Sequence, residues 1–149
     1  MSATEIAQAF LDPRGRCDRQ GLLFIAIVLL VLQLVLGGGF WLADVDLTGP
    51  AAMLLKAVFF WAAIAAAAKR LHDFGRSAWW LVGGLAVAVA WSFALAFAAI
   101  LMIGPEALTP QSPWFAAFFA GTSLPLFAAL MWLHFAKGMP GPNRFGPAT

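Results

Sequence analysis

The residues of this sequence that could bind a ligand gather in three short polar segments beside long apolar stretches. Residues 14–19 read RGRCDR, residues 69–77 read KRLHDFGRS, and residues 138–147 read GMPGPNRFGP. Guanidinium groups bind phosphate in paired geometry, and basic pockets at the cytoplasmic ends of membrane helices bind anionic lipid headgroups. The segments predict an anion or lipid-headgroup site with these members: Arg16, Arg19, Arg70, His72, Arg76, Asn143 and Arg144.

The same segments also fit a purely structural role. Gly75 suits the left-handed conformation that ends a helix, and Ser77 suits the N-cap of a following helix. Asp73 could pair with Arg76, Arg70 or an N-terminal arginine. The Gly- and Pro-rich tail could fold as a tight turn against the 69–77 loop. In this interpretation a structural clasp contains Gly15, Asp73, Gly75, Ser77, Gly141 and Gly146.

Catalytic patterns are weak in this chain. His72 and Asp73 are adjacent, which tends to point their side chains apart and does not make a catalytic pair. His134 has no metal-ligand spacing to either residue, and the lone Cys17 cannot form an intrachain disulfide. We predict no catalytic residue, no metal and no cofactor.

Four apolar blocks must position these polar segments. Of the 149 residues, 62% are hydrophobic and 11% charged, which is far too few charges for a soluble domain. A helix of about 20 apolar residues crosses a bilayer core. We therefore predict an all-α, single-domain, four-transmembrane-helix bundle with spans at about 21–42, 51–68, 78–103 and 113–136. Residues 1–20 and 137–149 lie outside the spans, and residues 4–11 form a short amphipathic helix or a frayed tail.

The charges predict the orientation of the bundle. Eight of the nine Lys and Arg residues flank the spans on one side: Arg14, Arg16, Arg19, Lys69, Arg70, Arg76, Lys137 and Arg144. The other two connections hold Asp44, Asp46 and Glu106 and no basic residue. Basic residues in short loops mark the cytoplasmic side, so both termini are expected in the cytoplasm. Trp41 and Trp114 would anchor the outer interface, and Trp79 and Trp80 the inner one.

Two residues inside the spans are unusual. Lys56 is the ninth basic residue and is expected to extend its side chain to the outer headgroups. Pro125 should leave the carbonyl of Gly121 without its helical partner, a defect that the Thr122 or Ser123 hydroxyl could relieve.

The polar segments resemble the motifs of a known family, the "domain of unknown function 805" family of small bacterial inner-membrane proteins. The matching residues are Gly15, Arg16 and Arg19; Arg70, Leu71, His72, Asp73, Gly75, Arg76, Ser77, Trp79 and Trp80; and Gly141, Asn143, Arg144, Phe145 and Gly146. Lys69 stands where a second arginine is usual, and residues 20–22 depart from the pattern. The resemblance implies a bacterial inner-membrane location and implies no activity.

Three functions remain open from the sequence. The first is a non-catalytic role in binding anionic phospholipid or a lipid-linked phosphate at the basic face. The second is a small transporter or channel subunit, and the third is a membrane scaffold that docks a cytoplasmic partner. The lipid bilayer is the expected partner and a homo-oligomer stays open, whereas a net charge of only +2 gives no reason to expect nucleic acid.

Overall fold

The computed structural model describes residues 8–44, 46 and 48–147. Its long helices are α2 (Arg19–Leu42), α3 (Pro50–Asp73), α4 (Trp79–Met102) and α5 (Phe115–Phe135), with a short 3-10 helix η1 at Pro105–Leu108. All four are long and apolar enough to cross a membrane, and the chain is an all-α, multi-pass membrane protein. Residues 4–7 of the predicted N-terminal amphipathic helix lie outside the described residues, and residues 8–11 form a single helical turn.

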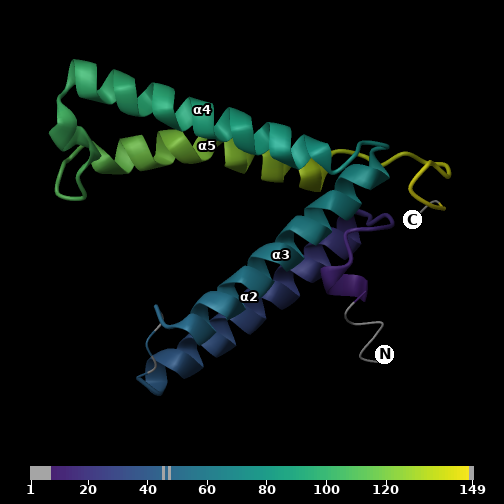
Figure 1. Ribbon diagram of the computed structural model, residues 1–149. Helices are drawn as coiled ribbons and strands as arrows, with labels where there is room; N and C mark the ends of the chain where they lie inside the picture. The colour runs from purple at the N-terminus through teal and green to yellow at the C-terminus, as the bar shows by residue number, and fades with distance from the viewer. Residues whose placement is uncertain (1–7, 45, 47, 148–149) are drawn as a thin grey trace. The chain divides into compact units, whose positions relative to one another are not determined.

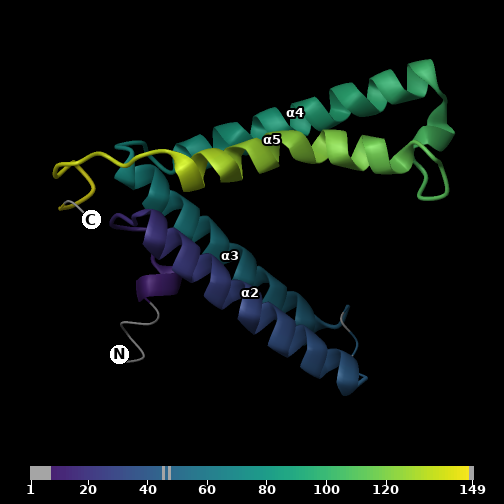
Figure 2. The ribbon, with the colours of Figure 1, turned by 180° about the vertical axis from the view of Figure 1, so that it is seen from behind.

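The chain divides into two compact units. One contains the chain up to residue 78 together with the tail from residue 136, and the other contains residues 79–135. In the first unit α2 and α3 run side by side and are joined at one end by the 43–49 connection (Figure 1). In the second unit α4 and α5 form a similar pair that is joined through η1 (Figure 2).

In the α2–α3 unit, small side chains let the two helices approach closely. The buried residues of α3 include Ala52, Ala62, Ala65, Ala66 and Ala68. Ala66 packs in a cluster with Ile25 of α2, and Leu22 and Leu29 lie against the same cluster. Since lipid gives little apolar driving force, close contact between small residues is how helices associate in a membrane.

The N-terminus of α2 is capped as its sequence allows. Asp18 is the N-cap, and its carboxylate accepts a 2.7 Å hydrogen bond from the Gly21 backbone N–H. A side chain at position 21 would collide with the Cys17 sulfur, because an added Cβ would lie 2.8 Å from it. This cap fixes the direction in which residues 14–18 leave the helix.

In the α4–α5 unit, the carbonyl freed by Pro125 has a partner that the sequence did not reveal. The Trp91 indole N–H of α4 donates a 2.9 Å hydrogen bond to the Gly121 carbonyl of α5. The Thr122 and Ser123 hydroxyls instead both donate to the Phe119 carbonyl, at 3.0 and 2.8 Å. The expected relief of the proline defect therefore comes from the neighbouring helix.

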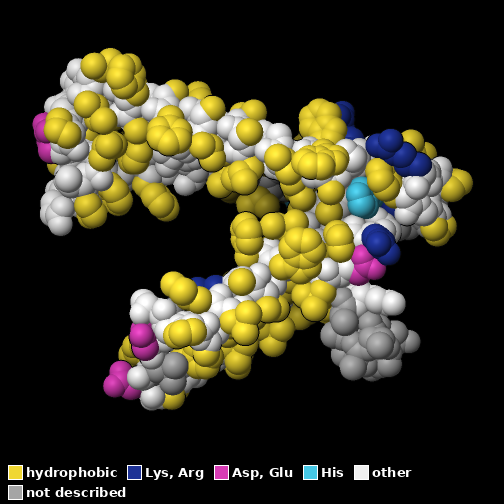
Figure 3. Space-filling model, in the orientation of Figure 1, with side chains coloured by type: hydrophobic (Ala, Val, Ile, Leu, Met, Phe, Trp, Pro, Cys, Tyr) yellow, Lys and Arg dark blue, Asp and Glu magenta, His cyan; other side chains and the backbone are white. Residues whose placement is uncertain are grey.

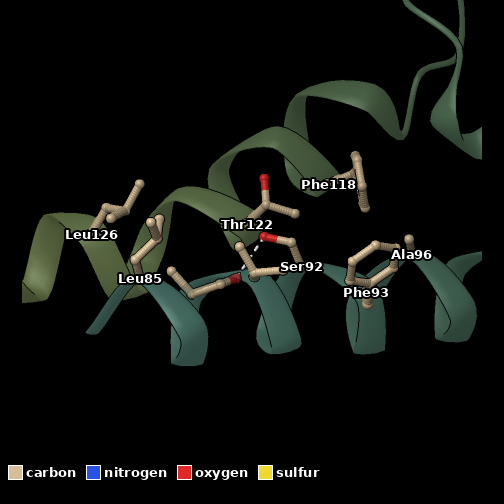
Figure 4. Close-up of a pocket in the computed structure, with 9 residues that line it drawn as sticks. Leu85, Ser92, Phe93, Ala96, Phe118, Thr122 and Leu126 are labelled. Atoms are coloured by element: carbon tan, nitrogen blue, oxygen red, sulfur yellow. Dashed lines mark hydrogen bonds between the residues drawn. The ribbon is translucent and has the colours of Figure 1, made fainter. Parts of the chain in front are cut away.

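A shallow groove lies between α4 and α5 (Figure 4). Its walls include Leu85, Phe93, Phe118 and Leu126, and its polar members are Ser92 and Thr122. Ser92 donates a 2.8 Å hydrogen bond to a carbonyl of its own helix, as Thr122 does, so these hydroxyls are satisfied locally.

Polar and apolar side chains are separated on the surface. Hydrophobic side chains cover most of the helical surface in view, whereas Lys and Arg side chains gather near the C-terminal segment (Figure 3). Acidic side chains lie at the opposite end of the α2–α3 pair, where the connection contains Asp44 and Asp46 (Figure 3).

Candidate functional site

At the center of the candidate site, one carboxylate bridges two arginines. Asp73 is the last residue of α3 and is 2% exposed. Its Oδ1 accepts hydrogen bonds from Arg16 Nε at 3.1 Å and Nη2 at 2.8 Å, and its Oδ2 accepts one from Arg70 Nη1 at 2.5 Å. Both arginine side chains are 1% exposed. We call Arg16, Arg70 and Asp73 the arginine clasp; it carries one net positive charge that is shielded from water.

The remaining donors of Arg16 bind the C-terminal tail. Nη1 donates to the Gly141 carbonyl at 2.6 Å and to the Pro147 carbonyl at 3.0 Å. Nη2 donates to the Met139 carbonyl at 2.7 Å. The Arg16 guanidinium therefore links residues 14–18, the end of α3 and the tail, and its donors are directed to the chain's own oxygens.

Arg70 makes the same link from within α3. Its Nη2 donates to the Ala136 carbonyl at 2.6 Å, where the tail leaves α5, and its Nη1 lies 3.5 Å from the Cys17 carbonyl. The guanidinium carbon lies 4.5 Å from the center of the Phe74 ring, a cation–π distance. Burial of a charged arginine is tolerated here because its donors have oxygen partners.

The composition of the tail explains how it can supply so many acceptors. Pro140, Pro142 and Pro147 cannot continue a helix and have no N–H of their own, so the carbonyls around them stay available to the arginines. The Met139 N–H donates to the Asp73 carbonyl at 2.9 Å. A Cβ at Gly138 would collide with the Asp73 carboxylate, so glycine is required there for the tail to approach the clasp.

His72 and Asn143 hold the loop and the tail together. The Nδ1 atom of His72 lies 3.0 Å from the Gly15 carbonyl, and because a carbonyl only accepts, Nδ1 must carry the proton. The His72 ring stacks on Phe145 with centroids 4.0 Å apart. Asn143 donates to the His72 carbonyl at 2.9 Å and accepts from the Phe145 N–H at 2.9 Å, and it forms an isolated bridge with Gly146.

Glycines with positive φ shape each segment of the site. The φ angles are +85° at Gly15, +72° at Gly75 and +147° at Gly146. Gly75 follows the C-cap of α3, and its N–H donates to the His72 carbonyl at 2.9 Å, which is a helix end of the predicted kind. The prediction that Ser77 caps the next helix is wrong: α4 begins at Trp79, two residues later, and the Ser77 side chain makes no hydrogen bond to the residues that the structure describes.

The remaining predicted arginines point outward. Arg19, Arg76 and Arg144, which we call the exposed arginine group, are all exposed. The Arg144 guanidinium lies over the Phe145 ring at 4.7 Å, with Nη2 3.5 Å from the Gly75 carbonyl. Arg76 follows Gly75 directly, so the Arg144 guanidinium contacts the peptide group next to Arg76.

Lys69 and Cys17 also belong to this region, although neither was among the predicted site residues. Lys69 is 8% exposed, and its Nζ donates to the Gln8 and Ala9 carbonyls at 2.8 and 2.7 Å. The Cys17 N–H donates to the Lys69 carbonyl at 3.2 Å. Burial, and to a lesser degree the negative charge of Asp18, raises the pKa of the Cys17 thiol. The sequence signal for Lys69 was its place in the 69–77 motif, where the resemblance puts a second arginine, which would carry the same positive charge.

The four tryptophans predicted to anchor the membrane interfaces lie at helix ends with large exposed surfaces. The exposed fractions are 75% for Trp41, 76% for Trp79, 55% for Trp80 and 53% for Trp114. Such positions suit side chains that sit between headgroups and hydrocarbon.

A known protein family matches most of the chain. The model of a family described as "Protein of unknown function (DUF805)" matches residues 10–147, a range that includes all three polar segments. No curated protein and no solved structure matches the chain.

Proposed function

The chain belongs to the DUF805 family, whose function is unknown, and from that premise we propose that it binds the phosphate of an anionic lipid or a lipid-linked phosphate at the exposed arginine group. The observation that carries this proposal is the contact of Arg144 with the Gly75 carbonyl, directly beside Arg76. Both side chains are exposed, and guanidinium groups bind phosphate in paired geometry, so in this proposal Arg76 and Arg144 bind one phosphate together.

The arginine clasp is what keeps these charges together. Arg16 and Arg70 hold the tail by its backbone carbonyls, so Arg144 cannot move away from the α3 end without breaking those bonds. Holding ligand groups in place before binding reduces the entropy that binding must overcome. In this proposal Arg16, Arg70, His72 and Asn143 build the frame, and Arg76 and Arg144 contact the phosphate. Arg19, the first residue of α2, is the third exposed arginine of the group.

The charge around the frame favors an anion. The described segments at this end of the α2–α3 unit carry eight basic residues against Asp12, Asp18 and Asp73. Juxtamembrane basic groups attract anionic lipid surfaces by about 1 kcal/mol per charge. The distribution of basic residues also supports the proposal that this face is cytoplasmic, and the family resemblance supports a bacterial inner membrane.

Native mass spectrometry of the detergent-solubilised protein with added phosphatidylglycerol tests this function. We expect an Arg76→Gln/Arg144→Gln double variant to retain at least tenfold less of this lipid than the wild type. Lys137→Gln is the matched control, because Lys137 is an exposed cation of the same tail outside the exposed arginine group. The proposal is wrong if the double variant retains the lipid at the wild-type level, or if the control loses as much as the double variant.

A further inference from the structure

A short helical turn at residues 8–11 lies against the α2–α3 pair, at the end that carries the arginine clasp (Figure 1). Its Phe10 side chain packs against the cluster of Cys17, Ile25 and Ala66. Ile25 belongs to α2 and Ala66 to α3, so the turn touches both helices of the pair. The turn is therefore packed as part of the α2–α3 unit.

Two side chains of α3 bind the backbone carbonyls of this turn. Lys69 Nζ donates to the Gln8 and Ala9 carbonyls at 2.8 and 2.7 Å, and the Trp61 indole N–H donates to the Leu11 carbonyl at 2.8 Å. The last four carbonyls of any helix lack a partner within the helix. Water can hydrate such carbonyls at a surface, whereas hydrocarbon offers them no donor. Pairing with side chains of α3 is what a lipid environment around the turn would require.

The position of Trp61 also favors lipid around the turn. Trp61 lies near the middle of α3, and its side chain is 47% exposed on the helix surface. A tryptophan at this level of a membrane span faces hydrocarbon, where its indole N–H needs a hydrogen-bond acceptor. The Leu11 carbonyl is that acceptor. The donor and the acceptor therefore satisfy each other at a place where neither could bind water.

The contacts place the turn below the ends of both apolar blocks. At a rise of 1.5 Å per residue, Ala66 lies about 3 Å and Trp61 about 10 Å inside the block of α3, which ends at Ala68. Ile25 lies about 6 Å inside the block of α2, which begins at Gly21. Amphipathic segments bury their apolar faces about 5–10 Å into the boundary between headgroups and acyl chains. Both helices thus give the turn the depth of an embedded segment.

We propose that residues 8–11 are embedded in the membrane leaflet nearest the arginine clasp, held there by Trp61 and Lys69, and that the outer face of the turn contacts lipid acyl chains. The side chains of the turn suit this partner, because none is charged and Leu11 is 39% exposed. The segment is separate from the exposed arginine group, and the inference does not depend on the proposed function.

Site-directed spin labelling of the full-length protein in vesicles of phosphatidylethanolamine and phosphatidylglycerol tests this placement. Cys17 is replaced by alanine, and a single cysteine is introduced for the label as Leu11→Cys, Arg14→Cys or Leu30→Cys. Leu30 lies in the middle of α2 and is 55% exposed, so it is the reference for contact with lipid. Arg14 is the matched control, because it is exposed, charged and only three residues beyond Leu11.

Oxygen concentrates in hydrocarbon and a nickel chelate stays in water, so the ratio of their collision rates with the label reports on its depth. We expect this ratio at Leu11→Cys to be at least fivefold higher than at Arg14→Cys and similar to that at Leu30→Cys. Adding Trp61→Phe removes the donor to the Leu11 carbonyl and should lower the ratio at Leu11→Cys at least twofold. Adding Trp41→Phe, at a 75% exposed tryptophan at the other end of α2, should leave the ratio unchanged.

Three results would overturn the proposal. An equal ratio at Leu11→Cys and Arg14→Cys would place the turn in water. Low collision rates of both oxygen and nickel at Leu11→Cys would mean that protein, such as a second copy of the chain, covers the turn in place of lipid. An unchanged ratio in Trp61→Phe, or an equal fall in Trp41→Phe, would show that the bond to Leu11 does not hold the turn. If circular dichroism shows that Cys17→Ala misfolds, Cys17→Ser provides a background of nearly the same shape.

Discussion

Replacement of Asp73 by asparagine should be among the most destabilising conservative changes in this protein. The substitution keeps the shape of the side chain but removes its charge. The carboxylate accepts three hydrogen bonds from Arg16 and Arg70, whose side chains are each 1% exposed. In Asp73→Asn the new amide nitrogen is a donor and at least one guanidinium N–H loses its acceptor. Removing one partner from a buried ion pair costs about 3–5 kcal/mol, because the remaining charge stays buried without compensation.

Reversible unfolding in mixed micelles, followed by circular dichroism, measures this free energy of unfolding. Asp12→Asn is the control, because Asp12 lies at the same end of the unit, is only partly buried and accepts a 2.9 Å bond from a backbone N–H that asparagine can also accept. We expect the control to stay within about 0.5 kcal/mol of the wild type. Trypsin should also cleave after Arg144 faster in Asp73→Asn, because Arg16 and Arg70 would bind the tail carbonyls less firmly.

A loss below about 1 kcal/mol in Asp73→Asn would refute this account of the clasp. It would mean that groups other than Asp73 compensate the buried guanidinium charges. Arg16 and Arg70 would then not be held in the frame by Asp73, and ligand binding would not be confined to the exposed arginine group.

Two further predictions use the same purified protein. Trp91→Phe leaves the Gly121 carbonyl without its indole donor and should lower the free energy of unfolding by about 0.6–1.7 kcal/mol. If Pro125→Ala is added, residue 125 regains an N–H, and the effect of Trp91→Phe should be smaller. An equal loss of stability from Trp91→Phe with and without Pro125→Ala would contradict this. Because burial raises the pKa of the Cys17 thiol, a maleimide should label the folded protein slowly at pH 8 and much faster after unfolding. The folded state binds this proton more tightly than the unfolded state, so the thiol's contribution to stability is complete below about pH 9 and declines as the pH rises through the folded pKa. Equal rates of maleimide labelling in the folded and unfolded states would count against a buried thiol.

The four long helices could be predicted because the length of an apolar block is a direct physical requirement for crossing a bilayer. The end of α3 does not follow from the length of the apolar block. The 69–77 motif predicts it near Leu71 or His72, close to the observed end at Asp73. The apolar block ends at residue 68, but the helix continues through Lys69, Arg70, His72 and Asp73, which are all buried. Charged residues usually end a membrane span. Here they extend the helix because they bind each other and the backbone of other segments.

The sequence predicts that the three polar segments lie close together, but it does not predict most of the contacts between them. The three polar segments lie at the same ends of the helices, so their proximity follows from topology. Which arginines turn inward depends on backbone carbonyls of the tail, and an acceptor of this kind leaves no side-chain signature in the sequence. The Gly121 carbonyl is a similar case, since Pro125 revealed the missing donor and only the structure revealed Trp91.

The division between buried and exposed arginines decides which substitutions can report on function. An Arg16 variant loses two bonds to Asp73 and three to the tail at once, so the position of Arg144 changes together with the charge. Loss of lipid in such a variant would follow equally from a displaced tail or from a missing ligand. Arg76 and Arg144 can be replaced while the bonds of the clasp remain, so a change in lipid retention at these positions reports on binding itself. Comparison of the two kinds of variant therefore separates the residues that hold the site together from those that contact the phosphate.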